Sequence, residues 1–90
     1  LIIEPGKKMS FQRHAHRNEY WIVTSGKCDV ISALDNGYMF PVATLAEHNS
    51  KVIPRKEWHQ LSNPYSEPCS IVEIQYGTSC IEEDIERKEI

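Results

Sequence analysis

The sequence lacks the features that mark membrane proteins and nucleic-acid-binding proteins. No apolar run approaches the roughly 18 to 20 residues that cross a bilayer, and no secretory hydrophobic segment opens the chain. Acidic and basic residues are mixed and leave a formal net charge of -3, so no sustained basic surface is available to neutralise a phosphate backbone. We therefore expect neither a membrane role nor a nucleic-acid partner.

Cysteine is also scarce. The three cysteines, Cys28, Cys69 and Cys80, are an odd number, and none lies in a C-x-x-C motif. Disulfide frameworks are typical of oxidising compartments and of small secreted domains. The sequence therefore predicts a reduced, cytoplasmic protein without a disulfide framework, in which the cysteines are small core residues.

Helical periodicity is weak almost everywhere, whereas short runs of β-type residues recur between turn residues. This pattern is typical of an all-β sandwich or barrel, and 90 residues suffice for one domain, residues 1–90. The expected strands are Lys8–His16, Glu19–Ser25, Cys28–Ala33, Tyr38–Leu45, Ser50–Ile53, Trp58–Ser62 and Cys69–Tyr76. Only the tail, residues 80–90, suggests a short helix. Because the chain begins with Leu1 rather than Met, we expect residues or a domain upstream.

Metal-capable side chains are concentrated in the stretch SFQRHAHRNEYW, residues 10–21. On a strand, alternation places Gln12, His14 and His16 on one face. A further histidine, His59, lies in another expected strand. In an antiparallel barrel the two strands can converge on the interior, so we expect one metal site built from residues that are distant in sequence.

These stretches resemble two motifs of the cupin superfamily. The run PGKKMSFQRHAHRNEYWIVTSG resembles the first motif, and PRKEWHQLSN resembles the second, with Pro54, His59 and Asn63 at its marked positions. Within the cupins, the sequence is similar to the isomerase domain of type II phosphomannose isomerases, through Q-x-H-x-H-R-x-E-x-W, VEIQYG and EEDIER. The resemblance extends from about Pro5 to Arg87 and implies a cupin-type antiparallel β-barrel, or jelly roll.

The general cupin pattern, H-x-H-x(3 to 4)-E-x(6)-G, fits this sequence in two ways. Glu19 and Gly26, with six residues between them, fix the register, and a four-residue gap before Glu19 leads back to His14 and then Gln12. We favour this set, completed by His59. The alternative set uses His14, His16 and Glu19. The favoured set also matches the ligands that the resemblance to phosphomannose isomerases of the other type implies.

The resemblance implies an isomerase of mannose 6-phosphate and fructose 6-phosphate, which needs a cation, a base and a binding site for phosphate. The ligand types suit zinc first, and manganese, iron or cobalt as alternatives. His16 is the first candidate for the base and Glu73 the second. Alternation from Cys69 to Tyr76 places Glu73 and Gln75 on one face, where both can line a pocket. The cations that a phosphate requires are expected from Arg17, Lys56 and Arg87.

Two motif glycines are replaced, by His48 and by Lys56, although both positions usually require unusual backbone angles. Two other functions remain open: an iron-dependent cupin dioxygenase and a non-catalytic sugar-binding module. A homodimer is expected, since a barrel this small exposes edge strands.

Overall fold

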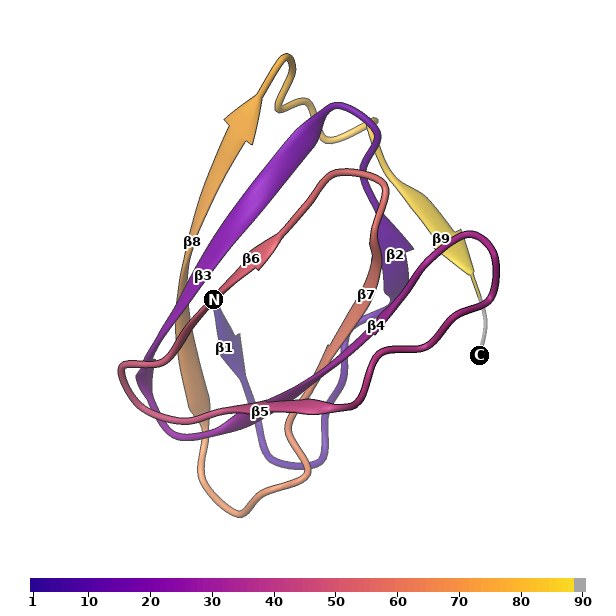
Figure 1. The fold of residues 1–90 in the computed structure, drawn as a ribbon. Helices are drawn as coiled ribbons and strands as arrows, with labels where there is room; N and C mark the ends of the chain where they lie inside the picture. The colour runs from indigo at the N-terminus through magenta and orange to yellow at the C-terminus, as the bar shows by residue number, and fades with distance from the viewer. Residues whose placement is uncertain (89–90) are drawn as a thin grey trace.

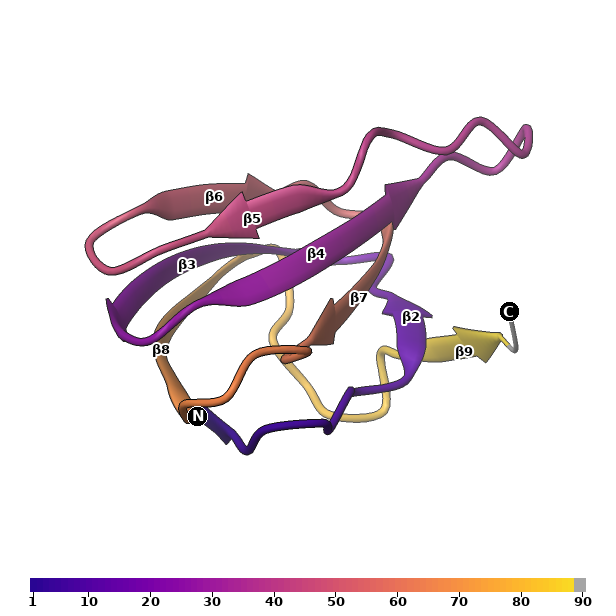
Figure 2. The same cartoon turned by 90° about the horizontal axis from the view of Figure 1, so that it is seen from below.

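The computed structural model describes residues 1–88, which form nine strands and no helix. One antiparallel sheet has the order β1 (Ile2–Ile3), β8 (Cys69–Gly77), β3 (Arg17–Ser25), β6 (Ser50–Ile53). The other has the order β5 (Ala43–Leu45), β4 (Cys28–Ala33), β7 (Trp58–Ser62), β2 (Phe11–Arg13), β9 (Glu86–Lys88). Figure 1 shows the two sheets facing each other, and Figure 2 shows the turn that joins β3 in one sheet to β4 in the other. The fold is an all-β jelly roll, as the sequence predicts.

Three strands, β4, β6 and β7, have the bounds that the sequence predicts, while two others are shorter. The expected strand Lys8–His16 ends at Arg13, because the chain bends at residues 15 and 16, and the expected strand Tyr38–Leu45 is regular only in β5. No helix in residues 1–88 has the length and hydrophobicity needed to span a bilayer.

The expected C-terminal helix is wrong for the described part of the tail. Residues 86–88 form β9, which adds to the edge of β2 and pairs Gln12 with Arg87. Ile81 and Ile85 alone give too narrow an apolar stripe to hold a helix on the barrel, whereas the free edge of β2 satisfies the backbone groups of an extended segment. Residues 89–90 of the predicted helix lie outside the described residues.

The hydrophobic core lies between the sheets, where alternate residues of each strand point inward. Its buried members are Ile3, Trp21, Val23, Cys28, Val30, Leu45, Ile53, Leu61, Cys69 and Ile71. A smaller cluster of Phe11, Ala33 and Trp58 lies apart from it. The main core fills one end of the barrel and leaves the other end to polar side chains.

In the second half of β8, polar side chains face inward and apolar side chains face outward, which is the reverse of the usual pattern. Glu73 and Gln75 pair with Trp21 and Glu19 of β3 and share their inward face. On the outer face, Ile74 is 49% exposed although it is apolar. Exposed apolar faces on small proteins are typical of interaction surfaces. The homodimer stays a prediction, and this outer face is where substitutions should test it.

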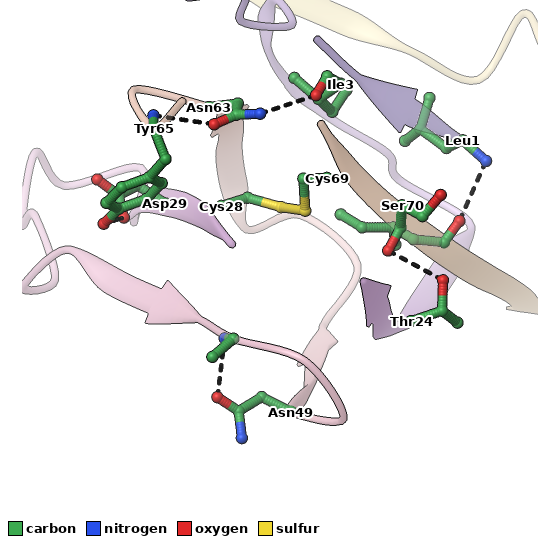
Figure 3. The surroundings of a disulfide bond; sticks show 12 residues. Leu1, Ile3, Thr24, Cys28, Asp29, Asn49, Asn63, Tyr65, Cys69 and Ser70 are labelled. Carbon is green, nitrogen blue, oxygen red and sulfur yellow. Dashed lines mark hydrogen bonds between the residues drawn. A yellow bond between two sulfur atoms is a disulfide. The ribbon is translucent and has the colours of Figure 1, made fainter. Parts of the chain in front are cut away.

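Two cysteines form a disulfide, contrary to the sequence-based expectation. Cys28 begins β4 and Cys69 begins β8, so the bond joins the two sheets at one end of the barrel, with both residues fully buried (Figure 3). Gly26 allows these strand ends to approach each other, because a Cβ at this position would lie only 2.2 Å from the carbonyl oxygen of Pro68. The third cysteine, Cys80, is exposed rather than in the core.

Asn63, a marked position of the second motif, has a structural role. The side chain of this buried residue donates from Nδ2 to the carbonyl oxygen of Ile3, at 2.9 Å, and accepts at Oδ1 from the backbone N–H of Tyr65 (Figure 3). Nδ2 also donates to the carbonyl oxygen of Glu67, at 2.8 Å. These bonds fix the turn that leads to Cys69.

The two replaced glycines adopt the backbone angles that the motif requires. His48, with φ of 72°, and Lys56, with φ of 69°, are the two non-glycine residues in the left-handed region among residues 1–88. Both turns therefore keep the backbone angles usual at these motif positions, although neither residue is glycine.

Candidate metal centre and pocket

Three of the predicted ligands come together inside the barrel. His14 follows β2, Glu19 lies on β3 and His59 on β7, and their ligand atoms all lie within 4.8 Å of one another. All three side chains are buried, with 2 to 3% of each residue exposed. These residues are far apart in the sequence, but the sheets bring them together, because β2 pairs with β7 and β3 faces both strands from the opposite layer. Three side chains that could hold a metal ion therefore converge from both layers.

Hydrogen bonds to carbonyl groups orient both imidazoles. Nδ1 of His14 lies 2.7 Å from the carbonyl oxygen of Asp84, and Nδ1 of His59 lies 3.0 Å from that of Glu57. A carbonyl only accepts, so each Nδ1 carries the proton and each Nε2 presents its lone pair. This arrangement is typical of histidines that bind a metal through Nε2.

The Nε2 atom of His59 is buried without a hydrogen-bond partner in residues 1–88. A buried hydrogen-bond acceptor without a partner destabilises the folded protein unless a ligand binds to it. Burial also lowers the pKa of His59, so its ring is neutral near pH 7 and free to donate a lone pair. The residue therefore fits a metal ligand better than a structural histidine.

The Glu19 carboxylate accepts hydrogen bonds from two side chains, Arg17 and Trp21. Arg17 lies two residues earlier on the same inward face of β3, and its Nε and Nη2 lie 3.1 Å and 3.0 Å from Oε2. Trp21 donates from Nε1 to Oε1 at 2.9 Å, and Nε2 of His14 is 3.3 Å from Oε2. These contacts keep the carboxylate in one orientation, and Nη1 of Arg17 remains buried without a partner in the described chain.

A pocket of about 260 Å³ opens beside these residues. It is lined by Met9, Gln12, Arg17, Glu19, Glu73, Gln75, Glu82, Ile85 and Arg87. The lining therefore combines two guanidinium groups with three carboxylates, and it includes both polar residues that alternation along β8 predicts. A larger hollow of about 380 Å³ lies at the other end of the barrel near Gly26 and Tyr65, away from every proposed ligand.

The fourth proposed ligand, Gln12, lines the pocket beside His59, its partner in the register of β2 and β7. Its Oε1 accepts a hydrogen bond of 2.8 Å from Oγ of Ser10. An amide oxygen has two lone pairs, so this bond leaves one of them for a cation.

His16 does not join the group. Its backbone lies in the bend after β2, its side chain is exposed, and it is not among the pocket-lining residues. The expectation that it shares a face with Gln12 and His14 is wrong, because alternation holds only while a strand continues. Lys56 is also exposed and outside the pocket. The second candidate for the base, Glu73, lies in the pocket wall instead.

The pKa of Glu73 is raised, first by burial and then by the negative charge of Glu19. A carboxyl group with a raised pKa is a stronger base once ionised, which suits proton transfer near neutral pH. The charges of Arg17 and Glu82 act on it as well, Arg17 lowering and Glu82 raising its pKa.

Two functional contacts are not evident from the sequence. Trp21 is buried in the core, and its indole also donates to Glu19 and packs its edge against His59, with ring centroids 5.5 Å apart. Asp84 contacts the bend after β2, and the motif EEDIER gives its position but not this contact.

The family model described as "Mannose-6-phosphate isomerase C-terminal" matches residues 1–90. The chain belongs to this family. It is 37% identical over 89 residues to mannose-1-phosphate guanylyltransferase of Salmonella muenchen and 39% identical over 89 residues to the alginate biosynthesis protein AlgA of Pseudomonas aeruginosa. Each match covers 99% of this chain but only 18% and 17% of those proteins. This domain of the mannose-6-phosphate isomerase family therefore spans less than a fifth of the length of these curated relatives.

Solved structures support the cupin fold of this domain. The capsular polysaccharide assembling protein CapF of Staphylococcus aureus matches with a TM-score of 0.87 and 18% identity, over 100% of this chain and 27% of that one. A sugar phosphate isomerase of the cupin superfamily from Silicibacter pomeroyi matches with a TM-score of 0.70 and 21% identity, over 86% of this chain and 47% of that one.

Proposed function

We propose that this cupin domain is a metal-dependent isomerase that interconverts mannose 6-phosphate and fructose 6-phosphate. The observation that supports this most directly is the convergence of His14, Glu19 and His59 beside a charged pocket. The family to which the chain belongs and its likeness to the sugar phosphate isomerase from Silicibacter pomeroyi support the same substrate class.

The proposed ligands are Gln12, His14, Glu19 and His59. Two neutral imidazoles, a carboxylate and an amide oxygen suit zinc, and also manganese, iron or cobalt. A divalent cation bound by these residues would supply positive charge next to the sugar oxygens, where negative charge develops as the proton leaves carbon.

The other pocket residues have separate roles in the proposal. Glu73 takes the proton from C2 of the aldose and returns it to C1, while the hydroxyl proton moves from the oxygen on C2 to the oxygen on C1. This requires the carboxylate form of Glu73 at the start of each cycle. Arg87 stands on β9 opposite Gln12 and binds the phosphate, for which a guanidinium fork is well suited. The unpartnered Nη1 of Arg17 donates to an oxygen of the bound sugar.

The experiment is to strip the protein of metal, reload it with zinc, manganese, iron or cobalt, and measure conversion of mannose 6-phosphate. We expect turnover with at least one metal, loss of metal and turnover in His59→Ala, and normal turnover in Lys27→Met, which lies at the far hollow. Fully metallated protein that converts neither sugar phosphate contradicts the proposal.

The same samples separate the two other functions. Iron as the bound metal, together with oxygen consumption, indicates a dioxygenase. A melting temperature raised by a hexose phosphate without any turnover indicates a sugar-binding module, because a ligand that binds only the native state stabilises it.

A further inference from the structure

The segment that follows β8 crosses the polar end of the barrel. In Figure 1 it runs from the end of β8 to β9 in the opposite sheet, and two of its residues, Glu82 and Ile85, line the pocket. We refer to residues 78–85 as the strap. It carries part of the EEDIER motif, for which the proposed function assigns a role only to Arg87.

Asp84 connects the strap to the bend after β2. Its Oδ1 accepts from the backbone N–H of Ala15 at 3.0 Å, and its Oδ2 accepts from that of His16 at 2.8 Å. Two adjacent N–H groups in a bend have no strand partner, and a carboxylate can accept from both at once. The two bonds therefore fix the bend and the strap to each other.

The backbone carbonyl of Asp84 sets the tautomer of His14, one of the proposed metal ligands. The carbonyl oxygen of Asp84 accepts from Nδ1 of His14 at 2.7 Å, across 70 residues of sequence. The carbonyl that orients His59 belongs to Glu57, only two residues away. The orientation of His59 is thus a local property of its turn, whereas that of His14 depends on where the strap docks.

We propose that Asp84 is a positioning residue: its carboxylate anchors the strap so that its own carbonyl holds the His14 ring with Nδ1 protonated and Nε2 presented to the cation. The proposal rests on the metal site of the proposed function. It also implies that the strap residues on the pocket wall, Glu82 and Ile85, are placed by the same anchor.

The test uses the whole chain and compares Asp84→Asn and Asp84→Ala with the wild type. Glu83→Gln is the matched control, because it removes a charge from the adjacent, exposed residue of the strap. Zinc affinity is measured by competition with a chromophoric chelator. Second-sphere groups typically change metal affinity by about 10- to 100-fold. We expect a loss of at least about tenfold in both Asp84 variants and of less than about twofold in Glu83→Gln.

A second readout needs no metal and no activity. The ¹⁵N chemical shifts of the His14 ring in metal-free protein report which nitrogen carries the proton. We expect a protonated Nδ1 in the wild type and in Glu83→Gln, and a mixture of tautomers in Asp84→Ala. A merely structural role would lower the melting temperature without changing the tautomer.

The outcomes separate this inference from the function on which it rests. If the wild type binds no divalent metal, the proposed metal site is wrong. If it binds zinc but the Asp84 variants bind it equally well, the positioning role is overturned. A wild-type His14 with the proton on Nε2 overturns it as well, and this measurement holds even where a variant fails to fold.

Discussion

Arg17 and Glu19, two residues apart on β3, form an ion pair in the interior of the protein, with Nη2 3.0 Å from Oε2. Nη2 also lies 3.2 Å from Nε2 of His14, so the guanidinium contacts two of the proposed ligands at once. A buried carboxylate needs a counter-charge. Without a metal, Arg17 supplies it.

The first prediction concerns this counter-charge. Arg17→Met leaves Glu19 buried without its cation, and breaking a buried pair in this way costs about 3 kcal/mol. We expect the free energy of unfolding in urea to fall by about that amount in metal-free protein, and by less in saturating zinc, because the metal then neutralises Glu19. Arg55→Met, at an exposed arginine, should change little in either condition. An equal loss of unfolding free energy with and without zinc would show that the metal does not bind to Glu19.

The second prediction concerns the pH dependence of catalysis. Glu73 acts as a base only when ionised, and its pKa is raised above the ordinary value of 4.5, so kcat/KM should fall as the pH drops through that raised pKa. Glu73→Gln should lower kcat by about 100-fold or more. The measurement is a pH–rate profile of isomerisation.

Glu82 provides the control for that assignment, because its negative charge contributes to the raised pKa of Glu73. In Glu82→Gln the acidic limb of the profile should therefore move to lower pH. A limb that stays in place in Glu82→Gln, or persists in Glu73→Gln, would assign the titration to another group.

The third prediction concerns backbone strain at His48. A left-handed conformation destabilises a non-glycine residue by about 1 to 2 kcal/mol, and a change to glycine removes this strain. The greater freedom of glycine in the unfolded chain offsets about 0.5 to 1 kcal/mol of that gain. His48→Gly should therefore raise the free energy of unfolding by about 0.5 kcal/mol. The reverse change, Gly6→Ala, places a Cβ in open space at a φ of +78° and should lower it. Urea titrations of both variants measure whether the free energy of unfolding rises in His48→Gly and falls in Gly6→Ala. A loss of stability in His48→Gly would contradict the prediction.

The fourth prediction concerns the disulfide. It joins residues 41 apart, and closing a loop of that length reduces the entropy of the unfolded chain enough to stabilise the fold by about 4 kcal/mol. The double variant Cys28→Ala, Cys69→Ala should lower the free energy of unfolding by up to this amount. Cys80→Ser should not, because that cysteine is exposed and unbonded. Unchanged stability on adding reductant would show that the two thiols are not joined.

Sequence patterns were sufficient where the chemistry is local or periodic. The bounds of β4, β6 and β7 follow from alternation and turn residues, and the inward placement of Glu73 and Gln75 follows from the period of two along β8. The left-handed angles at His48 and Lys56 follow from glycine positions in the motif. The same reasoning failed at His16, since a bend interrupts the period that it assumes.

The sequence by itself determined the all-β class, the family and the residue types that can hold a cation, because these depend on composition, alternation and motif spacing. The tertiary structure decided which of them meet. It brings His14, Glu19 and His59 together, turns His16 outward, joins Cys28 to Cys69 and lays Asp84 against the bend after β2. Each of these contacts links segments from different strands or loops, and only the packing of the two sheets fixes the distances between them.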